Sequence, residues 1–467
     1  MHFSTDEQTL EDLNIFGKHG GESVYALFNR TRTRGGAKVL EELFRYPLAE
    51  EEAINKRSGV LRYFALACVE FPFQSELFDV AELYLANADE RTKIYQVVAA
   101  LSTLGERFTR LIGSDNNYKA IYKGVVALLE ILHTLNEFAA KTEDGMSGAA
   151  AGTTAYRAEL EAIRLLLADV GLAPLLSSPA KGKLTYGQVA EFDVLLRFRH
   201  CGTIGKLLRY IYHLDVYIAV AKVASGRGFT FPRALPAGAS AVRLEGVYHP
   251  LLKNPVPNTL DISPERNVLF LTGANMAGKS TFMKSTGIAL YLAHMGFPIP
   301  AHRMEFSVLD GMYTTINLQD NLGMGASHFY AEVLRVKKVA KELSGHKNLF
   351  VLFDELFRGT NVKDAYEGTV AITRAFAGRA NSIFVISTHI IEAGAALRES
   401  SPAVRFLFLP TLMERNTPVY TYTLEEGITD DRHGMVIINN EGILEILRGG
   451  SKSRGPAVPE SDKTKTV

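Results

Sequence analysis

The sequence has no tryptophan, only two cysteines and no excess of charge of either sign. The cysteines, Cys68 and Cys201, lie far apart and lack the spacing of metal ligands, which argues against a disulfide framework and favours a reducing compartment. We expect both to be buried free thiols, because isolated cysteines are usually buried. The 51 Lys and Arg residues balance the 51 Asp and Glu residues, so any contact with nucleic acid must use local patches of charge.

Long apolar runs are also missing. No uninterrupted apolar stretch approaches the roughly 18 residues that suggest a membrane span. The first residues, MHFSTDEQTLEDLNIF, carry acidic side chains where an export signal has a basic start and an apolar core. These absences predict a soluble, cytoplasmic protein with no membrane partner. They also argue against a transporter that carries its own membrane helices.

The two halves of the chain have different patterns, and 467 residues are enough for two or three domains. In the first half, apolar residues recur every three or four positions, which predicts amphipathic helices over 120–141, 155–172 and 186–224. The Gly- and Pro-containing stretch 225–240 is typical of a linker or a domain edge. In the second half, short β-branched and aromatic runs alternate with helical patterns, as in a parallel sheet covered by helices.

We therefore predict an α plus α/β fold, in which an all-helical domain precedes an α/β domain. Three runs of the second half are almost wholly apolar, and polar residues follow each of them: 268–272, 349–353 and 383–387. Such strands are buried on both faces, and ligands bind beyond their carboxyl ends. The predicted division is a helical domain over 1–240, an α/β domain over 241–449 and a disordered polar tail over 450–467.

The first of these strands leads into TGANMAGKST, which has the spacing of a phosphate-binding loop and continues into a helix. Backbone amides at the helix start would surround the phosphates of a nucleotide, aided by the helix dipole. Lys279 would neutralise phosphate charge, and the Ser280 hydroxyl would coordinate Mg²⁺. The predicted nucleotide-binding residues are Gly273, Ala274, Asn275, Met276, Ala277, Gly278, Lys279, Ser280 and Thr281.

The other two strands end in titratable residues. Asp354 and Glu355 directly follow five apolar residues, and two adjacent carboxylates would repel each other without a cation nearby. We predict that Asp354 holds the Mg²⁺ shell and that Glu355 orients and activates the attacking water. His389, in VISTHIIE, lies at the same edge of the sheet, where a histidine can donate to the γ-phosphate or sense its loss.

Together with LQDNLGMGASHFYAE and the segment 291–316, these motifs occur in the order found in the MutS family of DNA mismatch-repair ATPases, which the chain resembles over nearly all of 249–391. The resemblance implies an ABC-type P-loop ATPase that uses ATP and Mg²⁺ and works as a homodimer through its ATPase domains. It also implies that Ser327, flanked by Asn321 and Glu332, reaches the nucleotide held by the other subunit.

The chain departs from the family pattern at several positions. The family has Pro, Gly, Gly, Ser and Arg-Ser-Thr where this chain has Ala274, Ala277, Phe357, Asn361 and Ala326-Ser327-His328. The loop lysine, the hydroxyl and the paired carboxylates remain, so we expect nucleotide binding. Phe357 and His328 are expected in loops that face the other subunit. The family's adenine-stacking aromatic should fall near 255–257, where NPVPN contains none.

The segment 23–48 resembles the start of the family's helical core and lever domain. It lies close to residue 1, so we expect the family's mismatch-reading and connector domains to be absent. The only Phe-x-Glu triplet, which the family uses as a mismatch wedge, is 353–355 in the predicted sheet. Six basic residues are candidates for DNA phosphate contacts or for a solvated helix face: Lys181, Lys183, Arg197, Arg199, Lys206 and Arg209.

Two functions stay open. The first is a dimeric ATPase linked to mismatch repair, in which ATP binding moves the helical domain on mismatched, branched or otherwise irregular DNA, with other repair proteins as further partners. The second is an ATP-switched module that binds a protein partner and has lost DNA recognition, which the neutral charge favours. An ABC transporter subunit is disfavoured, because the sequence has no LSGGQ-type signature.

Overall fold

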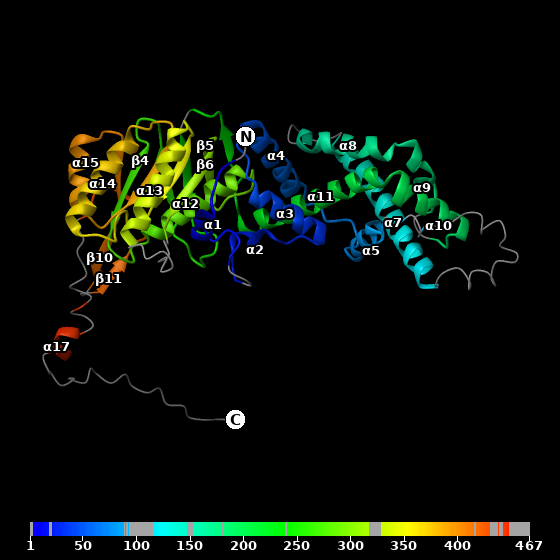
Figure 1. The fold of residues 1–467 in the computed structure, drawn as a ribbon, viewed down its shortest axis with the longest axis horizontal. Helices are drawn as coiled ribbons and strands as arrows, with labels where there is room; N and C mark the ends of the chain where they lie inside the picture. The colour runs from blue at the N-terminus through cyan, green and yellow to red at the C-terminus, as the bar shows by residue number, and fades with distance from the viewer. Residues whose placement is uncertain are drawn as a thin grey trace, which may run out of the picture.

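The computed structural model of the chain describes residues 3–17, 21–87, 115–146, 153–179, 182–238, 241–316, 328–414, 417–429 and 442–447, with single residues at 89, 92 and 438. The predicted tail and the predicted trans-acting Ser327 lie outside these ranges. The molecule is elongated, with the α/β part at one end and a helical arm of α5 and α7 to α10 at the other (Figure 1). None of its described helices is both long enough and apolar enough to cross a membrane.

The first half is helical, as its apolar periodicity predicts. Polar caps fix several helix starts: the Thr33 hydroxyl accepts the Gly36 N–H, and Thr185 and Gln188 form a capping box. The helices are α1 (Glu7–Asp12), α2 (Val24–Phe28), α3 (Arg34–Arg45), α4 (Glu51–Ala67), α5 (Glu76–Ala86), α7 (Asp115–Met146), α8 (Arg157–Leu167), α9 (Ala173–Ser177), α10 (Tyr186–Asp193) and α11 (Cys201–Arg227).

One expectation for this half is wrong. Cys68 and Cys201 are both exposed, because Cys68 ends α4 in a left-handed conformation and Cys201 begins α11 at the surface. The stretch 225–240, predicted as a linker or a domain edge, contains regular structure. Helix α11 continues to Arg227, and β1 (Arg233–Leu235) pairs in parallel with β5 (Arg303–Ser307) of the second half.

In its described residues, the second half contains two main sheets and a hairpin. In the six-stranded sheet, the order is β12-β9-β4-β8-β7-β6, and the strands from β9 to β6 are parallel. The four-stranded sheet has the order β1-β5-β2-β3, and β10 pairs with β11. The remaining strands are β2 (Val242–Val247), β3 (Asn258–Ile262), β4 (Val268–Gly273), β6 (Gly311–Thr315), β7 (Leu349–Phe353), β8 (Ile383–Ser387), β9 (Val404–Leu409), β10 (Thr411–Glu414), β11 (Thr417–Tyr420) and β12 (Glu425–Glu426).

Helices cover both faces of the six-stranded sheet. Leu269 and Leu271 of β4 join the core that contains α12, whereas Val268 and Phe270 join the core that contains α13 to α15. This alternation is the period of two that a strand buried on both faces requires. The helices of this half are α12 (Lys279–His294), α13 (His328–Ser344), α14 (Val362–Ala377), α15 (Ile391–Ser400) and α17 (Ile443–Leu447).

One hydrophobic core continues across the predicted division near residue 240. Phe3, Leu13 and Ile15 from the N-terminal segment and Val220 from α11 belong to the same buried cluster as Met283 of α12. Figure 1 shows α1 beside α12 and β6, although both of these elements lie far from α1 in the sequence. The N-terminal segment therefore packs as part of the α/β half.

Candidate functional site

The phosphate-binding loop connects β4 to α12 in an unusual backbone conformation. Gly273, Met276 and Gly278 have φ values of +148°, +69° and +103°. A Cβ at Gly278 would lie 3.0 Å from the Tyr422 ring, so this glycine is required by both conformation and space. The loop ends at the start of α12, where helical amides lack intrahelical acceptors and favour anions.

Lys279 begins α12 and lies almost wholly buried. Its Nζ donates to the carbonyl oxygens of Gly273 at 2.9 Å and Ala274 at 3.2 Å, so the side chain folds back over its own loop. Burial lowers the pKa of Lys279, while the nearby charges of Asp354 and Glu355 oppose this effect. An ammonium group with only carbonyl partners is available to neutralise an anion that enters the loop.

Asp354 lies where β7 ends and is held by both neighbouring strands. Its backbone N–H donates to the Thr315 carbonyl of β6 at 2.9 Å, and its carboxylate accepts a short hydrogen bond from the Ser387 hydroxyl of β8. The same hydroxyl accepts the Glu355 N–H at 3.2 Å. Because β8 lies between β4 and β7, Ser387 fixes the carboxylate end of β7 relative to the rest of the sheet.

Glu355 has a strained backbone, with φ of +54°, and its carboxylate is held by two basic side chains. His389 Nε2 lies 2.7 Å from one oxygen, and Arg358 donates to the other at 3.1 Å. The hydrogen bond from His389 is the main cause that lowers the pKa of Glu355 to about 2, and it outweighs the opposing effect of burial. Glu355 is therefore ionised at neutral pH.

The loop and Glu355 line one cavity of about 480 Å³. Seven of the nine predicted loop residues line this cavity, and Gly273 and Ala277 do not. The lining also includes three aromatic residues for which the sequence predicted no role: His249, Phe282 and Tyr422. Asn258, at the start of β3, holds the backbone around Tyr422 next to the cavity. Its side-chain amide donates to the Tyr422 carbonyl at 2.9 Å and accepts from the Leu424 N–H at 2.8 Å. The segment around Tyr422, more than 140 residues past the loop, is thereby held at the cavity. No local sequence motif indicates this position.

Phe357 does not face outward, contrary to the expectation from the sequence. Its side chain is only 6% exposed and packs edge-on against Phe329 of α13, with ring centroids 5.8 Å apart. Its φ is +63°, a conformation that glycine adopts without cost, and a Cβ at Gly368 of α14 would lie 2.9 Å from its ring. The phenylalanine thus binds the Glu355 turn to α13 and α14 within the subunit.

The other departures have simple local roles. Asn361 caps α14 by accepting the Asp364 N–H at 3.0 Å, a role that serine fills equally well. Ala277 is buried inside the loop. His328 begins α13, but its side chain lies outside the described residues. Arg197, one candidate for a DNA contact, is wholly buried against Asp193, so it cannot lie on a basic surface.

The donor set fits a magnesium nucleotide. Within the described ranges, no group of three or more His, Cys, Asp or Glu side chains could hold a metal by itself. Mg²⁺ commonly takes one or two protein oxygens and completes its shell with phosphates and water. The Ser280 hydroxyl and the Asp354 carboxylate are the two oxygens that the sequence predicts for this role. The loop amides would hold the phosphates.

A comparison with protein families agrees with this geometry. Residues 269–448 match the family model of MutS domain V, which is the ATPase domain of the MutS family. The match begins in β4 and includes the phosphate loop, the carboxylate end of β7 and the His389 strand end, whereas residues before 269 lie outside it. The α/β half of the chain therefore contains a domain that matches MutS domain V, the ATPase domain of the MutS family.

Proposed function

We propose that the chain binds and hydrolyses ATP with Mg²⁺ in the cavity between the phosphate loop and Glu355. The observation that carries this proposal is the convergence of Lys279, Glu355 and the loop amides on one cavity, with His389 hydrogen-bonded to Glu355. A helix start, a lysine and an ionised carboxylate are the groups that positioning and electrostatic catalysis of phosphoryl transfer require.

Each residue has a role in this reaction. Lys279 exchanges its carbonyl partners for phosphate oxygens, and Ser280 and Asp354 hold Mg²⁺, which screens phosphate charge when bound. Glu355 orients the attacking water. Its lowered pKa makes it a weak base while His389 and Arg358 hold it, so orientation of the water contributes more than early proton removal.

We further propose that Tyr422 supplies the aromatic surface for the base that NPVPN lacks. Its ring lies beside Gly278 at the mouth of the loop, and Pro255 and Val256 line the same cavity. An adenine could stack on this ring while its phosphates occupy the loop. Tyr422→Ala should weaken ATP binding by about fivefold, since stacking on one ring contributes on the order of 1 kcal/mol.

The test of the proposal is nucleotide binding and phosphate release by the full chain, compared with Lys279→Met. The wild type should bind ATP and release phosphate in the presence of Mg²⁺. Lys279→Met should lose both, while its melting temperature without nucleotide stays within a few degrees of the wild type. Hydrolysis that survives this substitution unchanged would reject the assigned site.

Dimerisation and DNA binding are the finer parts of the proposal. The resemblance to the MutS family supports a homodimer in which Ser327 completes the partner's site, and a mass measurement with and without a non-hydrolysable ATP analogue tests it. The alternative, an ATP-switched module that binds a protein partner, gains support from the basic residues. Arg197 is buried, and Arg209 is paired with Glu42, so two of the six candidates are engaged within the chain.

A panel of DNA structures distinguishes these two functions. Duplex, mismatched, branched and single-stranded DNA are titrated at low and high salt, with and without the ATP analogue. An ATP-dependent, salt-sensitive shift with irregular DNA supports the first function. No binding to any form at low salt supports the second.

A further inference from the structure

The N-terminal segment covers the open edge of the six-stranded sheet. Ser4 forms a parallel bridge with Gly311 of β6, its N–H donates to the Asp310 carbonyl at 2.8 Å, and its carbonyl accepts the Met312 N–H at 2.9 Å. A Cβ at Gly311 would lie 2.4 Å from the Ser4 carbonyl oxygen, so a glycine is needed for this approach. β6 is an edge strand of its sheet, and this pairing satisfies backbone groups that it would otherwise expose.

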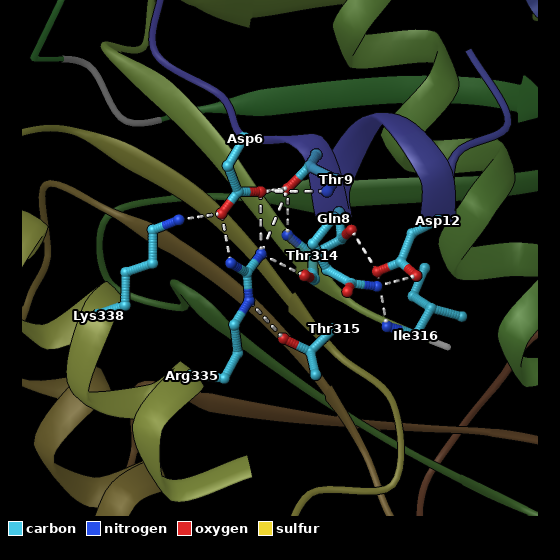
Figure 2. A network of polar contacts seen from close by, with 9 residues as sticks. All are labelled: Asp6, Gln8, Thr9, Asp12, Thr314, Thr315, Ile316, Arg335 and Lys338. Atoms are coloured by element: carbon cyan, nitrogen blue, oxygen red, sulfur yellow. Dashed lines mark hydrogen bonds and ion pairs between the residues drawn. The ribbon is translucent and has the colours of Figure 1, made fainter. Parts of the chain in front are cut away.

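An ion cluster, buried at Arg335 and half-exposed at Lys338, follows directly after this bridge (Figure 2). Arg335 of α13 forms a short ion pair with Asp6, and Lys338, one turn later, donates to the same carboxylate at 2.6 Å. The Asp6 and Arg335 side chains are only 14% and 8% exposed. Burial alone would raise the pKa of Asp6, but hydrogen bonds from Arg335 and Lys338 outweigh it and hold that pKa far below its usual range.

The cluster is connected to the end of β6. Arg335 also donates to the Thr314 carbonyl at 2.6 Å and to the Thr315 hydroxyl at 3.2 Å, while the Asp12 carboxylate accepts from the Thr314 hydroxyl at 2.7 Å and the Ile316 N–H at 2.9 Å. Figure 2 shows these side chains converging on the strand end from α1 on one side and α13 on the other. Both elements contact Thr314, while Arg335 of α13 also contacts Thr315 and Asp12 of α1 also contacts Ile316.

Residues 314–316 are hydrogen-bonded to the carboxyl end of β7, where Asp354 lies. The Thr315 carbonyl accepts the Asp354 N–H at 2.9 Å, so one hydrogen bond separates the cluster from the carboxylate end of β7. This backbone hydrogen bond transmits small displacements of the β6 end to the carboxyl end of β7, because a closely packed sheet deforms little. A misplacement of about 1 Å from a remote change can lower a catalytic rate by as much as 10²-fold.

We propose that Asp6 and Arg335 are positioning residues for ATP hydrolysis, which hold the carboxylate end of β7 in place through Thr315. This role rests on the proposed ATPase function of the chain. It assigns the N-terminal segment to the hydrolytic machinery, although Asp6 lies 329 positions from Arg335 in the sequence. Neither residue contacts the phosphate loop, so nucleotide binding should be nearly independent of them.

The experiment compares Asp6→Asn with the wild type and with Glu7→Gln, a neighbouring exposed carboxylate on α1. Asp6→Asn keeps the shape of the side chain but removes the charge that holds Arg335. It should lower kcat for ATP about tenfold while the affinity for ATP changes by no more than about twofold. Glu7→Gln should match the wild type in both. A purely structural cap would alter the melting temperature but leave kcat per folded molecule unchanged.

Hydrogen exchange gives a readout that does not depend on catalysis. The Ile316 and Asp354 amides should exchange at least about tenfold faster in Asp6→Asn without nucleotide, while amides of α12 stay protected. If the wild type hydrolyses no ATP, the ATPase proposal fails, and the exchange rates still decide whether the cluster holds the β7 end. If Asp6→Asn does not fold, Thr315→Val removes only the hydroxyl that Arg335 contacts and should show the same pattern more weakly. Unchanged kcat together with unchanged exchange at Asp354 would overturn the proposal.

Discussion

Two acid–base clusters of similar composition lie at opposite ends of the molecule. In the sheet, Glu355 is held by His389 and Arg358, and these three side chains are 26%, 38% and 67% exposed. In the helical arm, Asp193 is held by Arg197 at 2.6 Å, and both side chains are completely buried. The sheet cluster opens onto a cavity, whereas the arm cluster has no contact with solvent.

The partners of each cluster explain the difference. In the arm, Tyr84 donates to Asp193 at 2.7 Å, and Arg197 also donates to the Asn87 carbonyl and to Thr92, so every strong donor has an acceptor. In the sheet, Arg358 is mostly exposed and makes one such contact. We call the arm cluster closed, because it is fully buried and its donors are paired, and the sheet cluster open, because it is partly exposed. A closed cluster holds a helix in place, whereas the side chains of an open cluster can exchange their partners for a ligand. Buried charge alone therefore does not indicate a functional site.

The largest expected effect concerns the arm. Arg197→Met should lower the free energy of unfolding by about 3 to 5 kcal/mol, because it leaves the Asp193 carboxylate buried without its cation. Phosphate release per folded molecule should not change. Urea denaturation followed by circular dichroism measures the loss, and Arg199→Met, an exposed neighbour, should cost less than about 0.5 kcal/mol. Equal stabilities of the two variants would remove the distinction between closed and open clusters.

The next effect is a dependence of stability on pH that comes from two buried histidines. His294, at the end of α12, is completely buried. Its Nδ1–H donates to the Leu48 carbonyl at 2.8 Å, and its Nε2 has no hydrogen-bond partner among the described residues. Burial lowers the pKa of His294, and also that of His213 in α11, to about 4. Protons then bind preferentially to the unfolded chain, so stability is full above about pH 6.5 and falls as the pH drops toward 4.

For each of these histidines, lowering the pH from 6.5 to 5 should reduce the free energy of unfolding by about 1.5 kcal/mol, in a window above the titration of ordinary carboxylates. His294→Asn keeps a donor near the position of Nδ1 but cannot titrate, so its stability should fall less over this window. Denaturation curves at pH 7, 6 and 5 measure the slope. The same slope in both proteins would show that His294 is not the proton acceptor.

The smallest expected effect concerns Phe357, where two variants separate the cost of its backbone conformation from the stability that its ring packing contributes. Phe357→Ala and Phe357→Gly both remove the ring that packs on Phe329, but only glycine also removes the cost of the left-handed backbone. The glycine variant should therefore be more stable than the alanine variant by about 1 kcal/mol. Comparison of their denaturation midpoints decides the point, and an alanine variant of equal or greater stability would contradict it.

Local pattern was enough to predict the chemistry-bearing strand ends. The predicted strands 349–353 and 383–387 are β7 and β8, and the loop after β4 precedes a helix. A strand buried on both faces must be apolar throughout, so the polar residue that follows it is conspicuous. Residues of this kind are recognised without knowledge of the fold.

The residues that the sequence did not reveal depend on contacts between distant segments. Tyr422 reaches the cavity through Asn258, 164 positions away, and Asp6 meets Arg335 across 329 positions. Phe357 was expected in a loop that faces the other subunit, but its ring is buried against Phe329 and Gly368. Periodicity reports which face of an element is apolar, and it contains no information about which distant segment covers that face.

The most direct test that the cluster of Glu355, His389 and Arg358 is the hydrolytic centre is a single-turnover measurement with Glu355→Gln. If Glu355 orients the attacking water, this variant should bind ATP with nearly wild-type affinity, yet hydrolyse the bound ATP about 10² to 10⁴ times more slowly. Glu399→Gln, an exposed carboxylate on α15, should behave as the wild type. Equal hydrolysis by Glu355→Gln and the wild type would contradict the assignment of the cluster as the hydrolytic centre.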